Sequence, residues 1–584
     1  MISSTNKSKL NLEKTLKQLI TITCKNFVNT KFSNLNNSSN RSKLYICAEP
    51  TLKLNNKNKK NNFLIMNTSK FNYSIDYTQA SDLIKTSKSE IFPKKITHFI
   101  NNEFIEITPN SDSSNQLFEK ISITNPTTEE TLASFYEATQ SEIDLAVKSA
   151  ENGFIEWNSF PLDIRVKLFM QLAEKLEQRI LEFSLLESID NGKILRDSCE
   201  DIKEVIRLLR YYGGFIDKQF GTTISAIDDF TIQTRRVPFG IVACISPWNY
   251  PLLMATWKII PALCAGNSVI LKPSEETPLS ILKFCELFAE VGFPKGFLNV
   301  VLGRGPKTGS LLTQHTKIAK VCFTGSTAAG RQVMINAAES NLKGVQLELG
   351  GKSPLIIFAD ADLENAADWL VNGAFFNSSQ NCICSSRILI QESIYENFIK
   401  MIVEKTEKLK VGKYDDPAAD LGPLINKRQF DNYFKFIDIA RKEGLQLRYG
   451  GKDLSKIFEK GFFVDPAIFI NVPDDSALAK QEIFAPLLSI LKPFKDTEEA
   501  IKRANDSIYG LAAGVFSSDL NKIEYFVRNI QSGNVHVNCY NMSPYNVPFG
   551  GMKQSGFGRD CGTDGIMEFT QTKSVFYFTD FKKI

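Results

Sequence analysis

The spacing of apolar residues predicts that the first part of the folded chain is mainly helical. From Asp163 to Ser188, apolar side chains recur at positions 164, 168, 169, 172, 176, 180, 183 and 186, which is the spacing of one face of a helix. Upstream, the segment ITHFINNEFIEI (96–107) has apolar residues on both sides of Asn101-Asn102, and this pattern predicts a β-hairpin with the two asparagines at its turn.

After Phe239 the pattern changes to short apolar runs that alternate with helical stretches. Strands are expected at 240–246, 268–272, 298–301 and 320–324, with helices at 251–265 and 278–291. This rhythm is typical of an α/β protein with a doubly wound parallel sheet. Because ligands of such sheets bind at the carboxyl ends of the strands, the loops after 246, 272 and 324 are the expected places for chemistry.

Each of these three loops has a candidate residue and a structural alternative. Gly325 and Ser326 begin a strand-to-helix turn, which could bind a phosphate or be a plain turn. Lys272 and Glu275 at another strand end could hold a ribose diol or form a solvated ion pair. Asn249 lies between aromatic and proline residues, so its amide could stabilise an oxyanion or belong to a rigid turn.

The choice of nucleophile is restricted by the small number of histidines. The three histidines are His98, His315 and His536, and none of them lies in a site-like motif. Covalent catalysis would therefore need a cysteine with another base. Cys382 lies in a loop of small polar residues, whereas Cys384 would face the other way in a strand. Glu348 interrupts an apolar run before two glycines. The alternatives are a buried structural cysteine and a salt-bridged core carboxylate.

The net charge of +4 on 584 residues conceals an uneven distribution. Residues 1–75 have a balance of +11 and contain 15 asparagines, which leaves −7 on residues 76–584. Such a basic, polar head is predicted to be disordered. It also resembles a transit peptide of a plastid or mitochondrion, with a possible amphipathic helix from Leu10 to Ile20. The alternative is an untargeted extension on a cytoplasmic protein.

The remaining composition argues against several classes of protein. The mildly acidic body gives no reason to expect a nucleic-acid partner. The sequence contains no run of 18 apolar residues, so we expect no membrane-spanning helix. Eleven cysteines without a CxxC pair, together with so few histidines, make a metal site an unfavourable prediction.

Taken in order, seven segments resemble the motifs of the aldehyde dehydrogenase superfamily over about residues 95 to 580. The segment PWNYPLLMATWKIIPALCAGN (247–267) looks most like the betaine aldehyde and aminoaldehyde branch. The seven segments are SPWNYP (246–251), LKPSEETP (271–278), FTGS (323–326), LELGGKSP (347–354), the Cys382 loop, EIFAP (482–486) and PFGGMKQSGFGR (548–559).

The resemblance implies a role for each matching residue. Cys382 matches the nucleophile, Glu348 the general base, and Asn249 the oxyanion-hole amide that acts with the Cys382 backbone N–H. The positions that match the cofactor site are Trp248, Lys272, Glu275, Gly325, Ser326, Glu482 and Phe484. The aromatic positions that match the substrate tunnel of the betaine branch are Tyr250, Trp257 and Phe376.

The implied reaction is oxidation of an aldehyde to its acid with NAD. A carboxylate at Glu275 accepts a ribose diol and repels a 2′-phosphate, which favours NAD over NADP. Glu348 favours hydrolysis of the thioester over transfer to coenzyme A. Betaine aldehyde or an aminoaldehyde is the first expectation for the substrate, and a general aliphatic or aromatic aldehyde is the second. An inactive relative with a binding role is the alternative from a different class.

The resemblance also implies the domain organisation and an assembly. The NAD-binding domain is expected at 94–219 and 239–346 after the 1–93 head, and the catalytic domain at 347–547. An antiparallel oligomerisation arm is expected at 220–238 and 548–584, which implies a homodimer or homotetramer.

Three residues depart from the family pattern close to the predicted site. Ser379 and Ala485 stand where the family usually has glycine, and Gln481 stands where it usually has an acid. If the backbone at 379 or 485 has positive φ, the non-glycine residue costs roughly 1–2 kcal/mol. Such a cost would tighten or misplace a loop without removing a catalytic group.

Overall fold

The computed structural model describes residues 77, 80, 83, 91–105 and 120–578. All of these residues lie within one compact unit, residues 74–584. The predicted disordered head and transit peptide, residues 1–93, lie outside the described residues apart from a few positions after residue 76.

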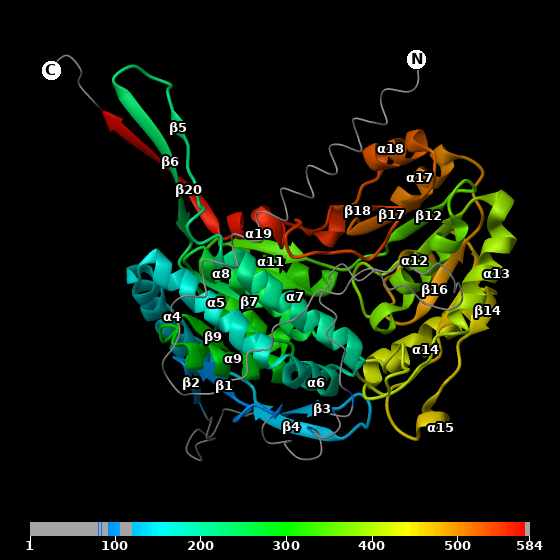
Figure 1. Cartoon of the computed structure of the whole chain (residues 1–584), viewed down its shortest axis with the longest axis horizontal. Coiled ribbons are helices and arrows are strands. Elements are labelled where there is room, and N and C mark those ends of the chain that lie inside the picture. Colours follow the sequence, from blue (N-terminus) through cyan, green and yellow to red (C-terminus); the bar gives the residue numbers. More distant parts are fainter. Residues whose placement is uncertain (1–76, 78–79, 81–82, 84–90, 106–119, 579–584) are drawn as a thin grey trace, which may run out of the picture. The chain divides into compact units, whose positions relative to one another are not determined.

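An eight-stranded sheet forms the first layer of this unit (Figure 1). Its central five strands, β7 to β11, run parallel, and β1, β2 and β19 flank them in antiparallel pairs. The doubly wound parallel sheet expected from the sequence is confirmed. In spatial order the strands are β19 (Gly556–Phe557), β11 (Gly344–Glu348), β10 (Lys320–Thr324), β7 (Ile241–Ile245), β8 (Ser268–Lys272), β9 (Leu298–Val300), β1 (His98–Ile100) and β2 (Glu103–Ile105).

The register of this sheet brings distant residues to one edge. Thr324 at the end of β10 lies beside Glu348 at the end of β11, and the Gly325 N–H donates to the Glu348 carbonyl at 3.0 Å. β7 ends at the same edge, where the Ser246 N–H donates to the Lys272 carbonyl at 3.1 Å. The carboxyl ends of four strands therefore share one edge.

A second sheet contains seven strands. All neighbouring pairs are parallel except β14 with β15, which is antiparallel. The chain crosses from the first sheet to the second between β11 and β12, over residues 349–353. In spatial order the strands are β14 (Gln446–Gly450), β15 (Ala467–Val472), β16 (Leu487–Leu491), β13 (Arg387–Ile390), β12 (Pro354–Ile357), β17 (Ala512–Phe516) and β18 (Asn534–Val537).

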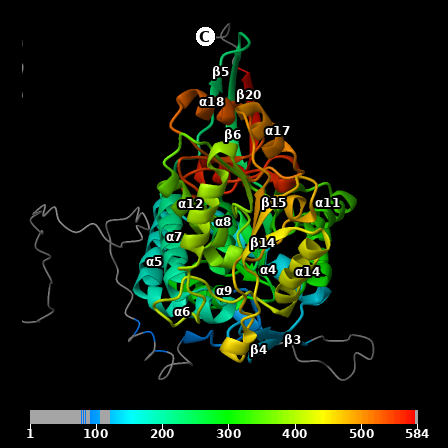
Figure 2. The same ribbon diagram turned by 90° about the vertical axis from the view of Figure 1, so that its right-hand side faces the viewer.

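A three-stranded antiparallel arm extends beyond these sheets in both views (Figures 1 and 2). Strand β6 (Phe230–Pro238) pairs with β20 (Thr570–Phe578) along its whole length and with the short β5 (Thr223–Ile224). The predicted second arm segment, 548–584, is too long at its start. Strand β19 pairs with β11 of the first sheet instead, and α19 (Gly562–Met567) packs on α8 (Pro251–Cys264).

The helical part of the chain forms four successive helices. The expected continuous helix over 163–188 is interrupted at Arg179, whose φ of −117° and ψ of 23° end one helix and begin the next. The four helices are α4 (Gln140–Ser159), α5 (Leu162–Gln178), α6 (Ile180–Asn191) and α7 (Leu195–Gly213). Among the described residues, no helix is both long and apolar enough to cross a membrane.

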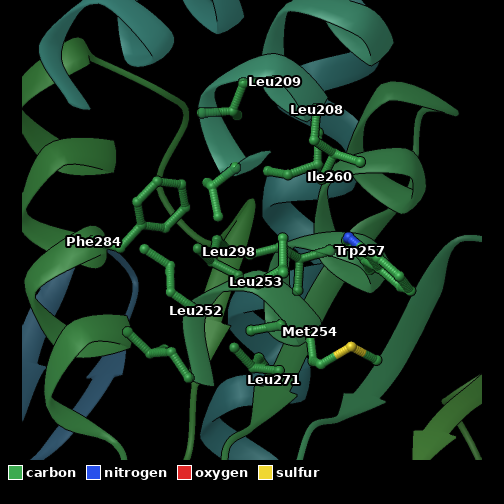
Figure 3. Close-up of a cluster of buried hydrophobic side chains, with 14 of the residues drawn as sticks. Leu208, Leu209, Leu252, Leu253, Met254, Trp257, Ile260, Leu271, Phe284 and Leu298 are labelled. Carbon is green, nitrogen blue, oxygen red and sulfur yellow. The ribbon is translucent and has the colours of Figure 1, made fainter. Parts of the chain in front are cut away.

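The largest buried core lies around α8, between the first sheet and the helical part. Every residue of α8 is buried, because apolar side chains of α7, α9 (Leu279–Val291) and the sheet surround it, among them Leu208, Phe284 and Leu271 (Figure 3). Burial of each such side chain contributes about 1.5–3 kcal/mol. This helix therefore fixes the loop that precedes it, residues 246–250, where Asn249 lies.

Candidate active site

The predicted nucleophile lies in a loop that begins with a left-handed turn. Helix α12 (Leu363–Phe375) ends at the turn, in which Asn377, Ser378 and Ser379 have φ values of 52°, 53° and 58°. Side chains secure this unusual backbone. The Asn377 Nδ2 donates to the Asn249 carbonyl at 3.1 Å, and the Ser379 Oγ donates to the Ala374 carbonyl at 2.5 Å. The oxyanion loop and the nucleophile loop are thus joined.

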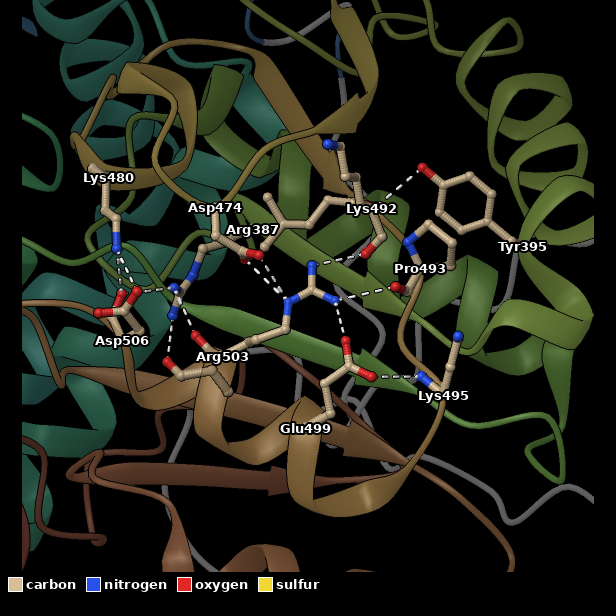
Figure 4. Close-up of polar contacts among 12 residues, drawn as sticks. Arg387, Tyr395, Asp474, Lys480, Lys492, Pro493, Lys495, Glu499, Arg503 and Asp506 are labelled. Carbon is tan, nitrogen blue, oxygen red and sulfur yellow. Dashed lines mark hydrogen bonds and ion pairs between the residues drawn. The ribbon is translucent and has the colours of Figure 1, made fainter.

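The other end of the nucleophile loop is fixed by Arg387, the first residue of β13. Its buried guanidinium donates to the carbonyls of Arg503, Ala504 and Asp506. Arg503 is itself held by Asp474 and Glu499, as Figure 4 shows. The loop from 376 to 386 is therefore held between two anchored ends.

Cys382 is partly exposed, in a turn between these anchors. Burial raises the pKa of its thiol, and the nearby carboxylates of Glu348 and Glu482 raise it further. The Asn249 Nδ2 donates to the Gln380 carbonyl at 2.9 Å, so the predicted oxyanion donor lies beside the nucleophile loop. The structure thus brings the three predicted catalytic residues, Cys382, Glu348 and Asn249, into one site.

Glu348 is the last residue of β11 and is 1% exposed. Burial raises its pKa to about 8, with a further rise from Asp560 and opposing effects of Lys258 and Arg559. Its Oε1 is buried without a hydrogen-bond partner among the described residues. A buried carboxylate with a raised pKa and a free oxygen suits a general base that binds a water molecule.

Lys258 and Asp560 were not predicted as part of the site. They form an ion pair of 2.8 Å in which both side chains are completely buried, and Asp560 also accepts from the Gln346 Nε2 at 2.9 Å. A lysine inside the apolar helix 251–265 was a visible signal. Its partner lies 302 residues away, so the sequence alone could not identify the pair.

Glu482 lies next to the segment that joins the two sheets. Its Oε1 accepts from the Gly351 N–H at 2.9 Å, and burial raises its pKa to about 7. A Cβ at Gly350 would lie only 2.2 Å from a Glu482 carboxylate oxygen, so a larger residue there would displace this carboxylate. Phe484 contacts Trp248 edge-on, with ring centroids 5.3 Å apart.

The edge of the first sheet has the features of a dinucleotide site. The Lys272 Nζ lies 3.5 Å from the Glu275 carboxylate, and burial lowers the pKa of Lys272. Ser326 caps α11 (Thr327–Ser340) by accepting from the Ala329 N–H at 3.3 Å, directly after Gly325. A helix N-terminus at a strand end favours a phosphate group.

Two unpaired groups support the same interpretation of this edge. The hydroxyls of Ser246 and Thr324, at the carboxyl ends of β7 and β10, are buried without a hydrogen-bond partner among the described residues. Buried hydroxyls normally have partners. A bound dinucleotide could supply them, so the residues present fit such a cofactor.

The predicted substrate residues occupy different environments. Tyr250 and Phe376 are partly exposed, and the Lys193 ammonium lies over the Tyr250 ring at 3.9 Å from its centroid. Trp257 is 4% exposed and packs edge-on against Phe549, so it contributes to the core as well.

The segment CYNMSPYN (539–546) contains two tyrosines, which lie in different surroundings. Tyr540 is completely buried, because its ring fits between Gly373 and Gly514, where a Cβ would lie 2.5 Å and 2.6 Å from it. It therefore belongs to the buried core. Tyr545 contacts Tyr211 of α7, with ring centroids 5.4 Å apart.

The departures at glycine positions have different structural consequences. Ser379 has φ of +58°, so the backbone strain expected for a non-glycine residue with positive φ is present at this position. Near the second departure, Phe484 has a left-handed backbone with φ of +57°, whereas the φ of Ala485 is not positive. The positive φ therefore lies one residue earlier than the departure.

The fold and the site together define an α/β protein with a dinucleotide crevice beside the Cys382 loop. The sequence profile of the Aldehyde dehydrogenase family matches residues 112–575. Retinal dehydrogenase 2 of Mus musculus is 44% identical over 481 residues, which cover 82% of this chain and 90% of the relative. The chain belongs to the aldehyde dehydrogenase family.

Solved structures agree with this assignment. Betaine aldehyde dehydrogenase of Staphylococcus aureus, in complex with NAD⁺, has a TM-score of 0.80 and 34% identity, and the match covers 86% of this chain and 98% of that one. An indole-3-acetaldehyde dehydrogenase of P. syringae, also with NAD⁺, has a TM-score of 0.81 and 36% identity, with 86% and 100% covered.

Proposed function

We propose that the protein oxidises an aldehyde to its carboxylic acid with NAD, through a covalent intermediate on Cys382. The observation that carries this proposal is the convergence of Cys382, Asn249 and Glu348 at the carboxyl edge of the first sheet. Lys272, Glu275 and the N-terminus of α11 would hold the dinucleotide. NAD supplies a hydride acceptor when bound.

The residues of the chain perform the other tasks. Cys382, once deprotonated, attacks the carbonyl carbon. The Asn249 amide and the Cys382 N–H stabilise the oxyanion, at roughly 3 kcal/mol per donor. Loss of hydride leaves a thioester on the sulfur. Glu348 then takes a proton from water, which attacks the thioester and releases the acid.

An uncharged aliphatic or aromatic aldehyde is our first candidate for the substrate. The chain is 44% identical to a retinal dehydrogenase and 34% identical to a betaine aldehyde dehydrogenase of known structure. Betaine aldehyde is the second candidate, because Tyr250, Trp257 and Phe376 match the aromatic positions that could hold its cation.

A matched pair of substrates separates these candidates. Betaine aldehyde and 3,3-dimethylbutanal have the same shape and differ in the charge of the quaternary centre. We expect a higher kcat/KM for the neutral compound, measured by NADH absorbance, and a preference for the cation would reverse the assignment. If no aldehyde yields NADH and C382A leaves the thiol reactivity unchanged, the chain is an inactive relative.

We further propose import into an organelle and assembly through the arm. A fluorescent protein fused to residues 1–93 should enter a plastid or mitochondrion, and a cytoplasmic signal would reject targeting. The large exposed apolar residues of the arm include Ile224, Phe230, Phe576 and Phe578. A sheet edge of this kind is suited to pairing with a second chain, which sedimentation velocity would detect as a dimer or tetramer.

A further inference from the structure

Asn381, the residue before the nucleophile, has a side chain with two defined bonds. Its Oδ1 accepts from the Ile383 N–H at 3.2 Å, and its Nδ2 donates to the Asn541 Oδ1 at 2.7 Å. Because a backbone N–H requires an acceptor, the first bond fixes which end of the amide is oxygen. The side chain is 6% exposed, so water does not readily replace these partners.

Cys382 lies at the tip of a turn that Asn381 closes twice. The Cys384 N–H donates to the Asn381 carbonyl at 3.0 Å, and the side-chain oxygen closes a smaller ring onto Ile383. The same oxygen lies 4.0 Å from the Cys382 Sγ. The orientation of one amide therefore decides whether the sulfur faces an oxygen or an NH₂ group.

Asn541 is a well-anchored partner for this amide. It has φ of +59°, which asparagine tolerates better than most residues. On one side Tyr540 is buried against Gly373 and Gly514. On the other side, the Met542 N–H donates to the His536 Nε2 at 3.3 Å. This segment thus presents a fixed acceptor to the nucleophile loop.

We propose that Asn381 and Asn541 act as a positioning pair that sets the environment of the Cys382 thiol. Asn541 holds the Asn381 NH₂ group away from the sulfur and keeps its oxygen toward the thiol and the Ile383 N–H. When this hold is released, the NH₂ group is free to turn toward the sulfur and stabilise a thiolate. This inference rests on the proposed role of Cys382 as nucleophile.

The test compares variants of Asn541 with matched variants of Asn546, an exposed asparagine of the same segment. N541G keeps the left-handed backbone but removes the acceptor, whereas N541D keeps an acceptor oxygen. Alkylation of Cys382 is followed against pH by peptide mass spectrometry, and kcat and KM are measured with one aldehyde. N546G and N546D are the controls.

We expect N541G to lower kcat about tenfold, the scale of one hydrogen bond, with an unchanged KM for NAD. Its alkylation midpoint should move to lower pH, whereas N541D keeps the acceptor and adds a carboxylate, so it should not move the midpoint to lower pH. N381A removes the amide oxygen that faces the thiol, so it should also move the alkylation midpoint to lower pH. The double variant N381A/N541G should match N381A, because the interaction is already lost.

Two results would refute the proposal that Asn381 and Asn541 act as a positioning pair. One is an alkylation profile of N541G that equals that of N546G, and the other is strict additivity in the double variant. If N541G does not fold, N381A decides the matter through the same midpoint, because an unchanged profile there removes the proposed effect of the amide. Absence of aldehyde oxidation in the wild type would reject the proposed function, but the alkylation profiles would still decide the pairing.

Discussion

The ion pair beside Glu348 predicts opposite effects of its two members on the general base. Asp560 raises the pKa of Glu348 and Lys258 lowers it, on top of the dominant effect of burial that brings the pKa to about 8. D560N removes the repelling charge and leaves the Lys258 ammonium uncompensated. Both changes favour the charged carboxylate, so the pKa should fall.

We expect the pKa of Glu348 to shift by about one unit or more, which corresponds to about 1.4 kcal/mol or more in the free-energy difference between its charged and neutral forms. K258M has the opposite sign, since it leaves the Asp560 carboxylate uncompensated and should raise the pKa above 8. Each single variant breaks a pair that is completely buried, which costs about 3–5 kcal/mol of stability. The combined K258M/D560N variant should recover part of both effects.

Single-turnover release of the acid, measured by rapid quench from pH 6 to 10, reports the hydrolysis step. Its rate should rise with pH through about 8 in the wild type, because only the deprotonated Glu348 accepts a proton from water. The midpoint should be lower in D560N and higher in K258M. Equal midpoints in the three proteins, with intact folds by circular dichroism, would refute this electrostatic account.

Three further predictions concern the base, the strained turn and the arm. E348Q should give a burst of one NADH per site followed by slow turnover. In the wild type, a carboxyl with a folded pKa of about 8 makes the unfolding free energy fall by about 1.4 kcal/mol per pH unit between about pH 4.5 and 8. E348Q should lose this fall. S379G should be more stable than S379A by about 1 kcal/mol in urea unfolding, because only glycine relieves the positive φ. Equal stabilities would argue against strain. F576E, on an exposed face of β20, should reduce the oligomer to smaller species in sedimentation velocity without lowering Tm; an unchanged assembly would argue against the arm.

The sequence was sufficient where local pattern and local function coincide. The apolar runs that predict β7 to β10 also define where those strands end, and the ends carry Lys272 and Ser326. Asn249 could be proposed for the same reason, since it follows a predicted strand and precedes a helix. In each case the chemistry lies within a few residues of the feature that predicts the element.

Contacts between distant segments could not be predicted from local sequence patterns. Lys258 shows in the sequence as a charge in an apolar helix, but Asp560 belongs to a segment expected in the arm. Only the pairing of β19 with β11 brings that segment beside Glu348. The arm prediction failed at 548–569 for the same reason, because a two-residue strand has no periodicity to recognise.

The left-handed turn before Cys382 shows how a departure from pattern gains meaning from structure. Three consecutive positive φ values are costly for residues with side chains, yet each side chain also finds a carbonyl: Asn377 that of Asn249, Ser378 that of Gly422 and Ser379 that of Ala374. Such bonds contribute about 1 kcal/mol each, which is comparable to the strain. Serine at 379 is therefore not simply a defective glycine, because its hydroxyl ties the turn to α12. The strain and the compensating bond act at the same residue, so only comparison of S379G with S379A can separate them.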